Sequence, residues 1–458
     1  MECFCVNSQE IENRIDPHFY RPEFIEFYEK LEKSKFKTIG EISEKVTSGA
    51  TPLSKGDSYT TQKEGIPFIR SGDINEDKSI NFDEVLYIKK DIHEKKLKGS
   101  KLKKGDLLIA IVGATIGQVS IYDYDREANI NQAIALVRLN EEVNSEYVKA
   151  FMISTLGQKQ LVRIKRPVAR ANINLDEIRS IKIILPTLEI QNHIVKIIDN
   201  AYKIKKQKEK ETQQLLDSFE DLLHKEKILN LKRTQQQKIF SINLEDLDGA
   251  LNPERYANQI QYDSSVDWIQ INKIGDVCRN TFDPEKSNPE DTYSLMRIDD
   301  LANNPISAVT RNVKGKDVNG IVLKVQTNDV LIARLGPSIE NKKFILAPKS
   351  SFKLISSNEF ICLRCYEKNN PYFALHLLRT DFYNNLMIQK TRGATPSRRR
   401  LSHEDFSELP IPKIDIKIQN KIADEVKKRM QKVEQLQKEA KELLEQAKDK
   451  IEQIILKN

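Results

Sequence analysis

The apolar positions repeat in two long stretches of the chain with the spacing of an amphipathic helix. In residues 418–455, which contain neither proline nor glycine, apolar side chains recur mostly in alternating steps of four and three. Residues 190–223 show the same rhythm. This heptad spacing keeps one apolar stripe on a single side of a helix, where it can face a partner helix. We therefore expect two helices, each roughly 50 Å long, that pair with each other.

The residues before the first long helix show the pattern of short strands, turns and a helix. Residues 107–112 and 133–139 are apolar runs of strand length, which indicates buried strands. Residues 145–154 have the pattern of a helix, with Ser145 as its expected cap. Pro186 then precedes the first long helix. This part of the chain is predicted to be a globular domain that mixes helices and strands.

The second half of the chain repeats the order of these features. The paired segments are 15–20 with 251–256, 38–42 with 273–277, 106–110 with 329–333, and 190–194 with 418–422. Two unrelated domains with similar linkers would explain any single pair, but an ordered set that ends in a heptad helix in each half favours an internal duplication.

The predicted fold class is therefore α+β. Two globular mixed α/β domains are separated by two long helices, which pair as an antiparallel coiled coil and give the molecule a pseudo-two-fold axis. The predicted boundaries are 1–185 for the first domain with an N-terminal segment 1–37, 186–240 for the first helix and linker, 241–412 for the second domain, and 413–458 for the second helix.

Composition indicates a well-charged chain that can fold into several domains. The 458 residues are 39% hydrophobic and 31% charged, with a mean hydropathy of −0.54. No apolar run has the length of a membrane span, and the N-terminus lacks the pattern of a signal peptide, so we expect a cytoplasmic protein with no membrane partner. The five cysteines are sparse and odd in number, which favours a reducing compartment. Cys362 and Cys365 lie in a strand-like run, where buried strand positions are a better interpretation than a metal site.

The motifs of common catalytic and cofactor sites are missing from the sequence. There is no glycine-rich dinucleotide or phosphate motif after a strand, and no methyltransferase motif of the Asn-Pro-Pro-aromatic type. The glycine-bearing segment 113–117 is better interpreted as a tight turn. The six histidines are scattered without metal-ligand spacing. These observations predict a chain without catalytic residues, metal ligands or a cofactor of its own.

The strongest local feature is a basic segment at matching places in the two halves, within residues 163–172 and 389–400. Arginine binds phosphate as a fork and reads guanine through two hydrogen bonds, and Asn, Ser and Thr add polar contacts. A single such segment could equally be a solvated basic loop, but its recurrence favours binding of nucleic acid. The candidate contacts are Arg163, Lys165, Arg166, Arg170, Asn172, Lys390, Arg392, Arg398, Arg399 and Arg400.

Further candidate contacts follow predicted strands or open a domain, and each could instead belong to an ordinary turn or a surface ion pair. They are Thr51, Lys55 and Tyr59 in a polar loop near the start of the first domain, Arg70, Ser71 and Arg297 at matching positions of the two halves, and Arg334 after the second buried strand.

The ordered set of these motifs resembles the specificity subunit of type I restriction-modification systems. The segments that carry the resemblance are 38–42, 48–52, 65–74, 102–109, 113–117 and 183–194. The second half departs from the pattern, because it lacks the Gly-Ala-Thr-Pro opening near residue 280 and has residues 298–300 as Ile-Asp-Asp where Ser71–Asp73 stands. We therefore expect the two domains to read different sequences.

The resemblance implies a DNA-recognition subunit that has no activity alone. Each globular domain would be a target recognition domain that reads one half of a split site in double-stranded DNA, and the helices would act as the spacer. The implied partners are two methyltransferase subunits, which would methylate adenine with S-adenosylmethionine, and restriction subunits that act as motor and nuclease. Two alternatives remain open: the recognition subunit of a system with a fused methyltransferase-nuclease, and a coiled-coil adaptor that does not touch DNA.

Overall fold

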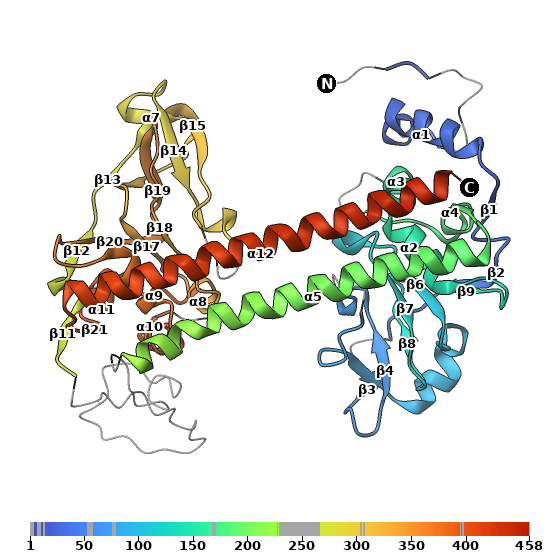
Figure 1. Ribbon diagram of the computed structural model, residues 1–458, viewed down its shortest axis with the longest axis horizontal. Coiled ribbons are helices and arrows are strands. Elements are labelled where there is room, and N and C mark those ends of the chain that lie inside the picture. The colour runs from blue at the N-terminus through green and yellow to red at the C-terminus, as the bar shows by residue number, and fades with distance from the viewer. Residues whose placement is uncertain are drawn as a thin grey trace. The chain divides into compact units, whose positions relative to one another are not determined.

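The computed structural model describes residues 4–6, 11, 14–52, 58–75, 79–166, 171–226, 228, 266–302, 305, 307–393, 395 and 398–457. The chain divides into two compact units, one of residues 1–209 with 438–458 and the other of residues 210–437. The long helices are α5 (Leu188–Lys225) and α12 (Ile416–Leu456), and each contributes one end to each unit (Figure 1). The predicted contacts Lys55 and Arg170, and segment 251–256 of the predicted duplication, lie outside the described residues.

The core of the first unit is built on a four-stranded antiparallel sheet. Its strands, in spatial order, are β2 (Ser43–Ser48), β9 (Ile134–Leu139), β6 (Asp106–Ala110) and β7 (Val119–Tyr122). Every residue of β6 is buried, which explains why its sequence is an unbroken apolar run after Asp106. The two predicted buried strands are therefore confirmed.

A second sheet of the first unit is made of shorter strands. In spatial order they are β3 (Tyr59–Thr60), β5 (Leu86–Ile88), β4 (Ile66–Ile69) and β8 (Asn129–Ile130), with β4 and β8 parallel. The turns beside them are η3 (Ser71–Asp73), η4 (Ile92–Lys96), which is a π-helical turn, and η5 (Lys98–Ser100). The turn η6 (Gly113–Thr115) follows β6, and Gly113 and Gly117 have φ angles of 78° and 94°. Because L-residues rarely adopt these angles, the predicted tight turn at 113–117 is confirmed.

Helices complete the first unit around the sheets. After η2 (Pro17–Tyr20) come α1 (Pro22–Glu32), α2 (Ser145–Ile153), α3 (Thr155–Ile164) and α4 (Leu175–Arg179), and the short strands β1 (Phe36–Thr38) and β10 (Lys182–Ile184) pair before α5 begins. The predicted cap of α2 is wrong by one residue. Asn144, not Ser145, caps it, because the Asn144 side chain accepts a hydrogen bond from the Tyr147 amide.

The second unit repeats the first sheet in the same order of strands. These are β12 (Gly275–Cys278), β20 (Phe360–Cys365), β17 (Val330–Ala333) and β18 (Phe344–Leu346). Its other sheet differs at the edges and runs β13 (Thr281–Phe282), β16 (Val322–Lys324), β19 (Lys353–Ser357), β14 (Thr292–Met296) and β15 (Arg311–Lys314). Cys362 and Cys365 lie on β20 as expected, with Cys362 fully buried and Cys365 half-buried.

The remaining elements of the second unit are turns, short helices and one pair of strands. They are η8 (Ile271–Lys273), α7 (Pro284–Ser287), η9 (Ile298–Asp300), η10 (Gly315–Asp317), α8 (Gly336–Glu340), α9 (Pro371–Leu378), α10 (Asp381–Lys390) and α11 (His403–Ser407), with β11 (Trp268–Gln270) paired to β21 (Pro410–Pro412).

Individual contacts show that the two units are copies of one plan. In the first sheet of the first unit, Arg138 Nη2 lies 2.7 Å from the carboxylate of buried Asp106. In the second unit Arg364 Nη2 lies 2.7 Å from buried Asp329, and both arginines approach their partner through two nitrogens. A charged pair at the same register of the same strands supports the predicted duplication more strongly than similar chain order does.

Within each unit, the ends of α5 and α12 pack together along their apolar stripes. In the second unit Glu226 pairs with Lys421 and the Ser218 carbonyl accepts from Arg429, so residue numbers run in opposite directions along the two helices. The apolar residues between these contacts join the core of that unit. They are Phe219, Leu223, Ile422, Val426 and Met430.

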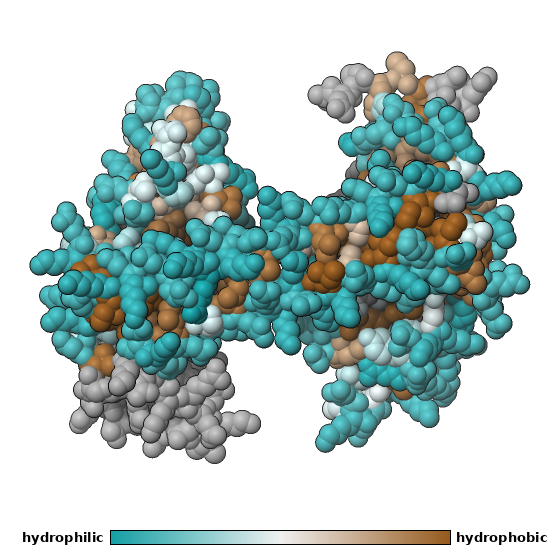
Figure 2. Space-filling view, viewed as in Figure 1, coloured by the Kyte–Doolittle hydropathy of each residue, from teal (hydrophilic) through white to brown (hydrophobic). Residues whose placement is uncertain are grey.

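In the first unit the other ends of the same helices meet in its main core. The contributing residues are Ile194, Ile198, Ala201, Ala447, Ile451 and Ile455. The antiparallel pairing predicted from the heptads is therefore confirmed. The face shown in Figure 2 is mostly hydrophilic, with patches of hydrophobic side chains in each unit. No helix among the described residues is long and apolar enough to cross a membrane.

Candidate nucleic-acid interface

In the second unit, the basic segment after α10 folds back on itself. The Arg392 amide donates to the Arg400 carbonyl at 3.0 Å, and the Arg400 amide donates to the Arg392 carbonyl at 2.8 Å. Both side chains are exposed, as is that of Arg398. Lys390, which ends α10, is half-exposed. Arg392, Arg398 and Arg400 therefore lie at the surface, and their predicted contact with nucleic acid stays a prediction.

The returning strand of this segment is fixed to the end of β17. The Leu401 amide donates to the Arg334 carbonyl at 2.9 Å, and the Gly336 amide donates to the Arg399 carbonyl at 3.0 Å. These bonds bring Arg334 beside the basic segment, although the two are far apart in the sequence. The Arg334 side chain is half-buried, and its Nε donates to the Leu401 carbonyl at 3.2 Å. Burial lowers the pKa of Arg334; Glu359 opposes this shift and the positive charge of Arg400 adds to it.

Carboxylates at the surface pair with several of these cations. Glu359 accepts from Arg400 Nε at 3.2 Å and Nη2 at 2.9 Å. Asp405 accepts from Arg392 at 3.2 Å. Because exposed ion pairs contribute little to stability, a phosphate group could replace Glu359 at small cost, whereas the Asp405 side chain is only 13% exposed. The segment therefore combines ordered cations with a partner that can be exchanged.

Arg279 joins this cationic surface from the end of β12, although the sequence analysis missed it. Its Nη2 lies 2.6 Å from Glu404, and this hydrogen bond lowers the pKa of the Glu404 carboxyl. Arg279 stands where the second half lacks the Gly-Ala-Thr-Pro opening of the first half. The sequence feature that could have identified Arg279 is its position directly after β12, the strand that matches β2 of the first unit.

The first unit holds its basic segment in the same backbone frame. The Ile173 amide donates to the Ile111 carbonyl at 3.0 Å, and the Gly113 amide to the Ala171 carbonyl at 2.9 Å. The Arg166 amide also donates to the Asn172 carbonyl, at 3.4 Å. Each bond has a counterpart in the second unit, so Arg166 corresponds to Arg392 and Asn172 to Arg400.

The side chains on this matching frame are less cationic in the first unit. Asn172 is exposed and Lys165 is half-exposed. Arg166 Nη2 lies 2.9 Å from Glu177, which also accepts from Arg14 Nη1 at 3.0 Å. The described ends of the two segments occupy matching places in the two units, but their chemistry differs.

Arg163 corrects the expectation of a continuous exposed basic segment. It lies in the last turn of α3 and is only 7% exposed. Its guanidinium carbon lies 3.9 Å from the ring centre of Phe19 and 4.0 Å from that of Tyr28, and its Nε donates to the Phe19 carbonyl. A separate helix, α3, stands where a basic loop was expected, and it turns this arginine into the core, where it packs between aromatic rings.

Arg70 is engaged in an ion pair within the first unit. Its Nη2 lies 2.8 Å from Oδ1 of Asp73, which is 2% exposed, and it also donates to the Glu84 carbonyl at 3.0 Å. The hydrogen bond to Asp73 raises the pKa of Arg70. Ser71 begins the same turn and is half-exposed. The observed contacts match the ion-pair alternative for Arg70.

Two residues of the polar opening loop have different environments. Tyr59 is half-buried, packs edge-on against Phe68 with ring centres 6.3 Å apart, and its hydroxyl donates to the Pro52 carbonyl at 3.4 Å. Thr51 is exposed, and its hydroxyl donates to Gln132. Thr51 therefore lies on the surface, whereas Tyr59 mainly packs.

Arg297 lies on a groove that meets the cationic surface of the second unit. The side chain is exposed, and the groove has a volume of about 500 Å³. Ser338, Asn358 and Glu359 also line it. Because Glu359 is the partner of Arg400, the groove and the basic segment share one wall.

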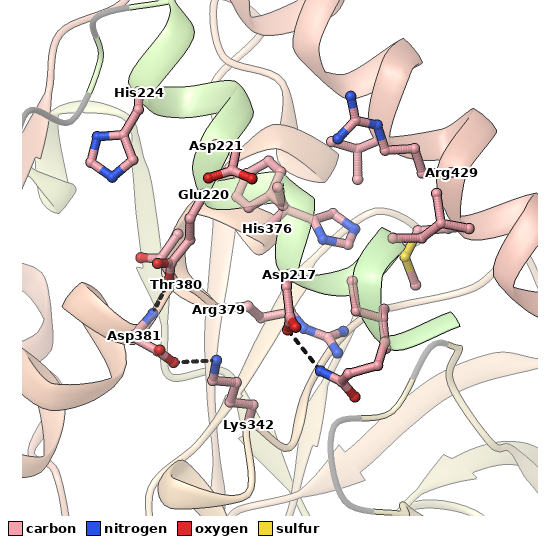
Figure 3. A pocket seen from close by; sticks show the side chains of 16 residues that line it. Asp217, Glu220, Asp221, His224, Lys342, His376, Arg379, Thr380, Asp381 and Arg429 are labelled. Atoms are coloured by element: carbon pink, nitrogen blue, oxygen red, sulfur yellow. Dashed lines mark hydrogen bonds and ion pairs between the residues drawn. The ribbon is translucent and has the colours of Figure 1, made fainter. Parts of the chain in front are cut away.

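A larger pocket of the second unit has a different character. It lies where α5, α9, α10 and α12 meet, and its volume is about 560 Å³ (Figure 3). Lys342 Nζ lies 2.6 Å from Asp381, whose amide donates to Glu220 at 2.6 Å. Burial lowers the pKa of His376 to about 3, so this imidazole is neutral. Acids and bases pair with each other here, in contrast to the arginine-rich surface.

Part of the chain is similar to proteins of one known family. Residues 31–216 match the family model described as the type I restriction modification DNA specificity domain. The chain is 33% identical over 143 residues to the type I restriction enzyme EcoBI specificity subunit of Escherichia coli, covering 31% of this chain and 29% of that protein. It is 27% identical over 190 residues to the putative type I restriction enzyme MjaX specificity subunit of Methanocaldococcus jannaschii. This match covers 40% of this chain and 42% of that protein.

The chain thus matches less than half the length of either of these relatives. A solved structure from work on complex assembly and conformational transition of the type I R-M system is also similar. The identity is 13% and the TM-score 0.49, with 92% of this chain and 96% of that chain covered.

Proposed function

We propose that this chain, whose residues 31–216 match the family model of the type I restriction modification DNA specificity domain, is the sequence-specific DNA-recognition subunit of a type I restriction-modification complex. The observation that carries the proposal is the repeated backbone frame that holds Arg166 and Asn172 in one unit, and Arg392 and Arg400 in the other. Each unit would read one half of a bipartite site in double-stranded DNA.

The chemistry of the two segments supports a division between phosphate and base contacts. Arginine forks such as those of Arg398 and Arg400 suit phosphate oxygens and the O6 and N7 atoms of guanine. The amide of Asn172 has the donor and acceptor that adenine presents in the major groove. Different side chains at equivalent positions would make the two halves of the DNA site different in sequence.

The helix pair is proposed to dock the other subunits and to act as the spacer between the half-sites. Its expected partners are two methyltransferase subunits that bind S-adenosylmethionine and methylate adenine, and restriction subunits that supply motor and nuclease activity. The chain itself would contribute recognition and no catalysis. The complex would act on cellular DNA in the cytoplasm.

Two alternatives make different predictions. A recognition subunit of a fused methyltransferase-nuclease system would bind the same kind of DNA site, and the genes next to this one would distinguish it. A coiled-coil adaptor would dock proteins through α5 and α12 without binding DNA. The exposed arginine cluster of the second unit favours a DNA-binding protein over such an adaptor.

The test is to map adenine methylation in cells that carry the methyltransferase partner with and without this chain. We expect a bipartite motif, two short defined sequences separated by a fixed unspecified gap, that appears only with the chain. A methylation pattern that is the same in both cells would contradict the proposed function.

A further inference from the structure

Three potential metal ligands that are separated in the sequence meet in the second sheet of the first unit. His93 and Glu94 lie in the π-helical turn η4 after β5, and Glu127 lies just before β8. One ligand atom from each lies within 4.8 Å of the others. The Nε2 atom of His93 is 3.5 Å from Oε1 of Glu127 and 3.9 Å from Oε1 of Glu94. Single π-helical turns often occur at functional sites.

The hydrogen bonds on the other side of the imidazole fix its orientation. Asn129 Nδ2 donates to the Leu97 carbonyl at 2.9 Å and to the Ser100 hydroxyl at 3.2 Å, so its Oδ1 atom is the acceptor that faces His93 Nδ1. His93 Nδ1 therefore donates to Asn129 Oδ1, and Nε2 faces the two carboxylates. A hydrogen bond from the remote ring nitrogen is the usual way in which proteins orient a metal-binding histidine.

The Nε2 atom of His93 has no hydrogen-bond partner among the described residues, and the side chain is completely buried. A buried polar atom without a partner is costly. A metal ion placed between this nitrogen and the two carboxylates would provide the missing partner.

The two carboxylates are arranged to receive an ion from solvent. The side chains of Glu94 and Glu127 are 45% and 59% exposed, so the side of the cluster opposite His93 is open. Lys101 contacts Oε2 of Glu94 and leaves Oε1 directed at His93.

We propose that His93, Glu94 and Glu127 bind a divalent transition-metal ion, with Zn²⁺ as the best fit and water completing its coordination. Zinc bonds to nitrogen and oxygen ligands are about 2.0–2.2 Å long, which places ligand atoms in a tetrahedral shell about 3.3–3.5 Å apart. The observed separations require only small movements of exposed glutamate side chains. An imidazole ligand favours zinc and its neighbours over Mg²⁺ and Ca²⁺, which prefer oxygen ligands alone.

The bound ion would connect the turn after β5 to the start of β8. It would hold in place the edge strand of this sheet and the segment that contains Arg126, whose guanidinium stacks on Phe82 at 3.6 Å. The role is structural, and it does not depend on the proposed function in DNA recognition.

The experiment is a titration of the full chain, first freed of metal by a chelator, with Zn²⁺ in competition with a chromophoric chelator. We expect one site per chain that is lost in H93Q and weakened by about tenfold or more in E94Q and in E127Q. Zinc should raise the melting temperature of the unchanged chain and not that of E127Q. E141Q, which removes an exposed acid elsewhere in the same unit, is the matched control and should bind zinc normally.

The two exposed glutamates keep the test decisive even if H93Q does not fold. Binding of Co²⁺ should give an absorption spectrum without the charge-transfer band of a cysteine ligand, which separates this site from one at Cys278 or Cys362. Zinc binding that is equal in the unchanged chain, E94Q and E127Q would overturn the proposal. The absence of any zinc binding would also overturn it and would leave the contact as a histidine–glutamate ion pair.

Discussion

Arginines of the second unit are held at the surface by carboxylate partners, which DNA phosphate would replace under the proposed function. Arg400 is paired with Glu359 and Arg392 with Asp405, and each of the four groups retains contact with solvent. Such pairs orient a guanidinium group before a ligand arrives, so less side-chain freedom is lost on binding. They also keep the free protein from presenting an unscreened positive patch.

Replacement of Arg398, Arg399 and Arg400 by alanine should weaken DNA binding of the complex between the chain and its methyltransferase partner. Each lost phosphate contact reduces the slope of log affinity against log salt by about 0.9, so a total reduction of up to about 3 is expected. Affinities measured at several salt concentrations provide the test.

The matched control is the double variant K368A and K417A, which removes exposed lysines elsewhere in the second unit and should leave the slope nearly unchanged. Binding by the triple variant that equals the unchanged protein at every salt concentration would remove this segment from the interface.

The paired ends of the long helices are parts of the cores of the units. Residues 438–458 belong to the first unit although they are last in the sequence. Ile451 and Ile455 are fully buried there against α5 residues such as Ile198. The fold of the first unit is therefore completed only when the last part of the chain returns to it.

Replacement of Ile451 by alanine should destabilise the first unit by about 2–5 kcal/mol, because a cavity opens in its core. Replacement of the neighbouring exposed Gln453 should change stability by less than about 0.5 kcal/mol. Urea unfolding followed by circular dichroism gives the comparison, and the fluorescence of Trp268, the one tryptophan, reports on the second unit separately. A midpoint for the Ile451 variant equal to that of the Gln453 variant would show that this contact does not stabilise the fold.

On the scale of the whole molecule, two copies of one plan carry different polar surfaces. The strand order of the main sheet and the frame of the basic segment are repeated, while the second sheet has four strands in one unit and five in the other. Asn172 and Arg400 occupy equivalent places with different chemistry. A duplicated scaffold with unlike side chains suits a reader of two unlike half-sites.

The variants N172A and R398A should therefore relax sequence preference in different halves of the DNA motif. Loss of a base contact costs about 1–3 kcal/mol of discrimination at the position that it reads. Adenine-methylation maps of cells that carry each variant measure the effect, with the unchanged chain as reference. Relaxation of the same half-site by both variants would contradict the assignment of one half-site to each unit.

Heptad spacing, unbroken apolar strands and the ordered repeat were enough to predict the helix pair, the buried strands and the duplication. Each of these follows from a local period or from chain order, which the sequence contains directly. The same information located the basic segment of the second unit, because a run of arginines beside Gly, Pro and Ser has no place in a core.

Only the tertiary structure decided which polar residues have partners and which meet one another. Arg163 and Arg398 look alike in sequence, yet α3 turns the first into a core of aromatic rings and the second stays exposed. His93 and Glu127 are brought together by strands whose pairing is not local, so no spacing rule could have linked them. The spacing of apolar residues along the chain determines which helices and strands form, whereas contacts between distant residues depend on how those helices and strands pack.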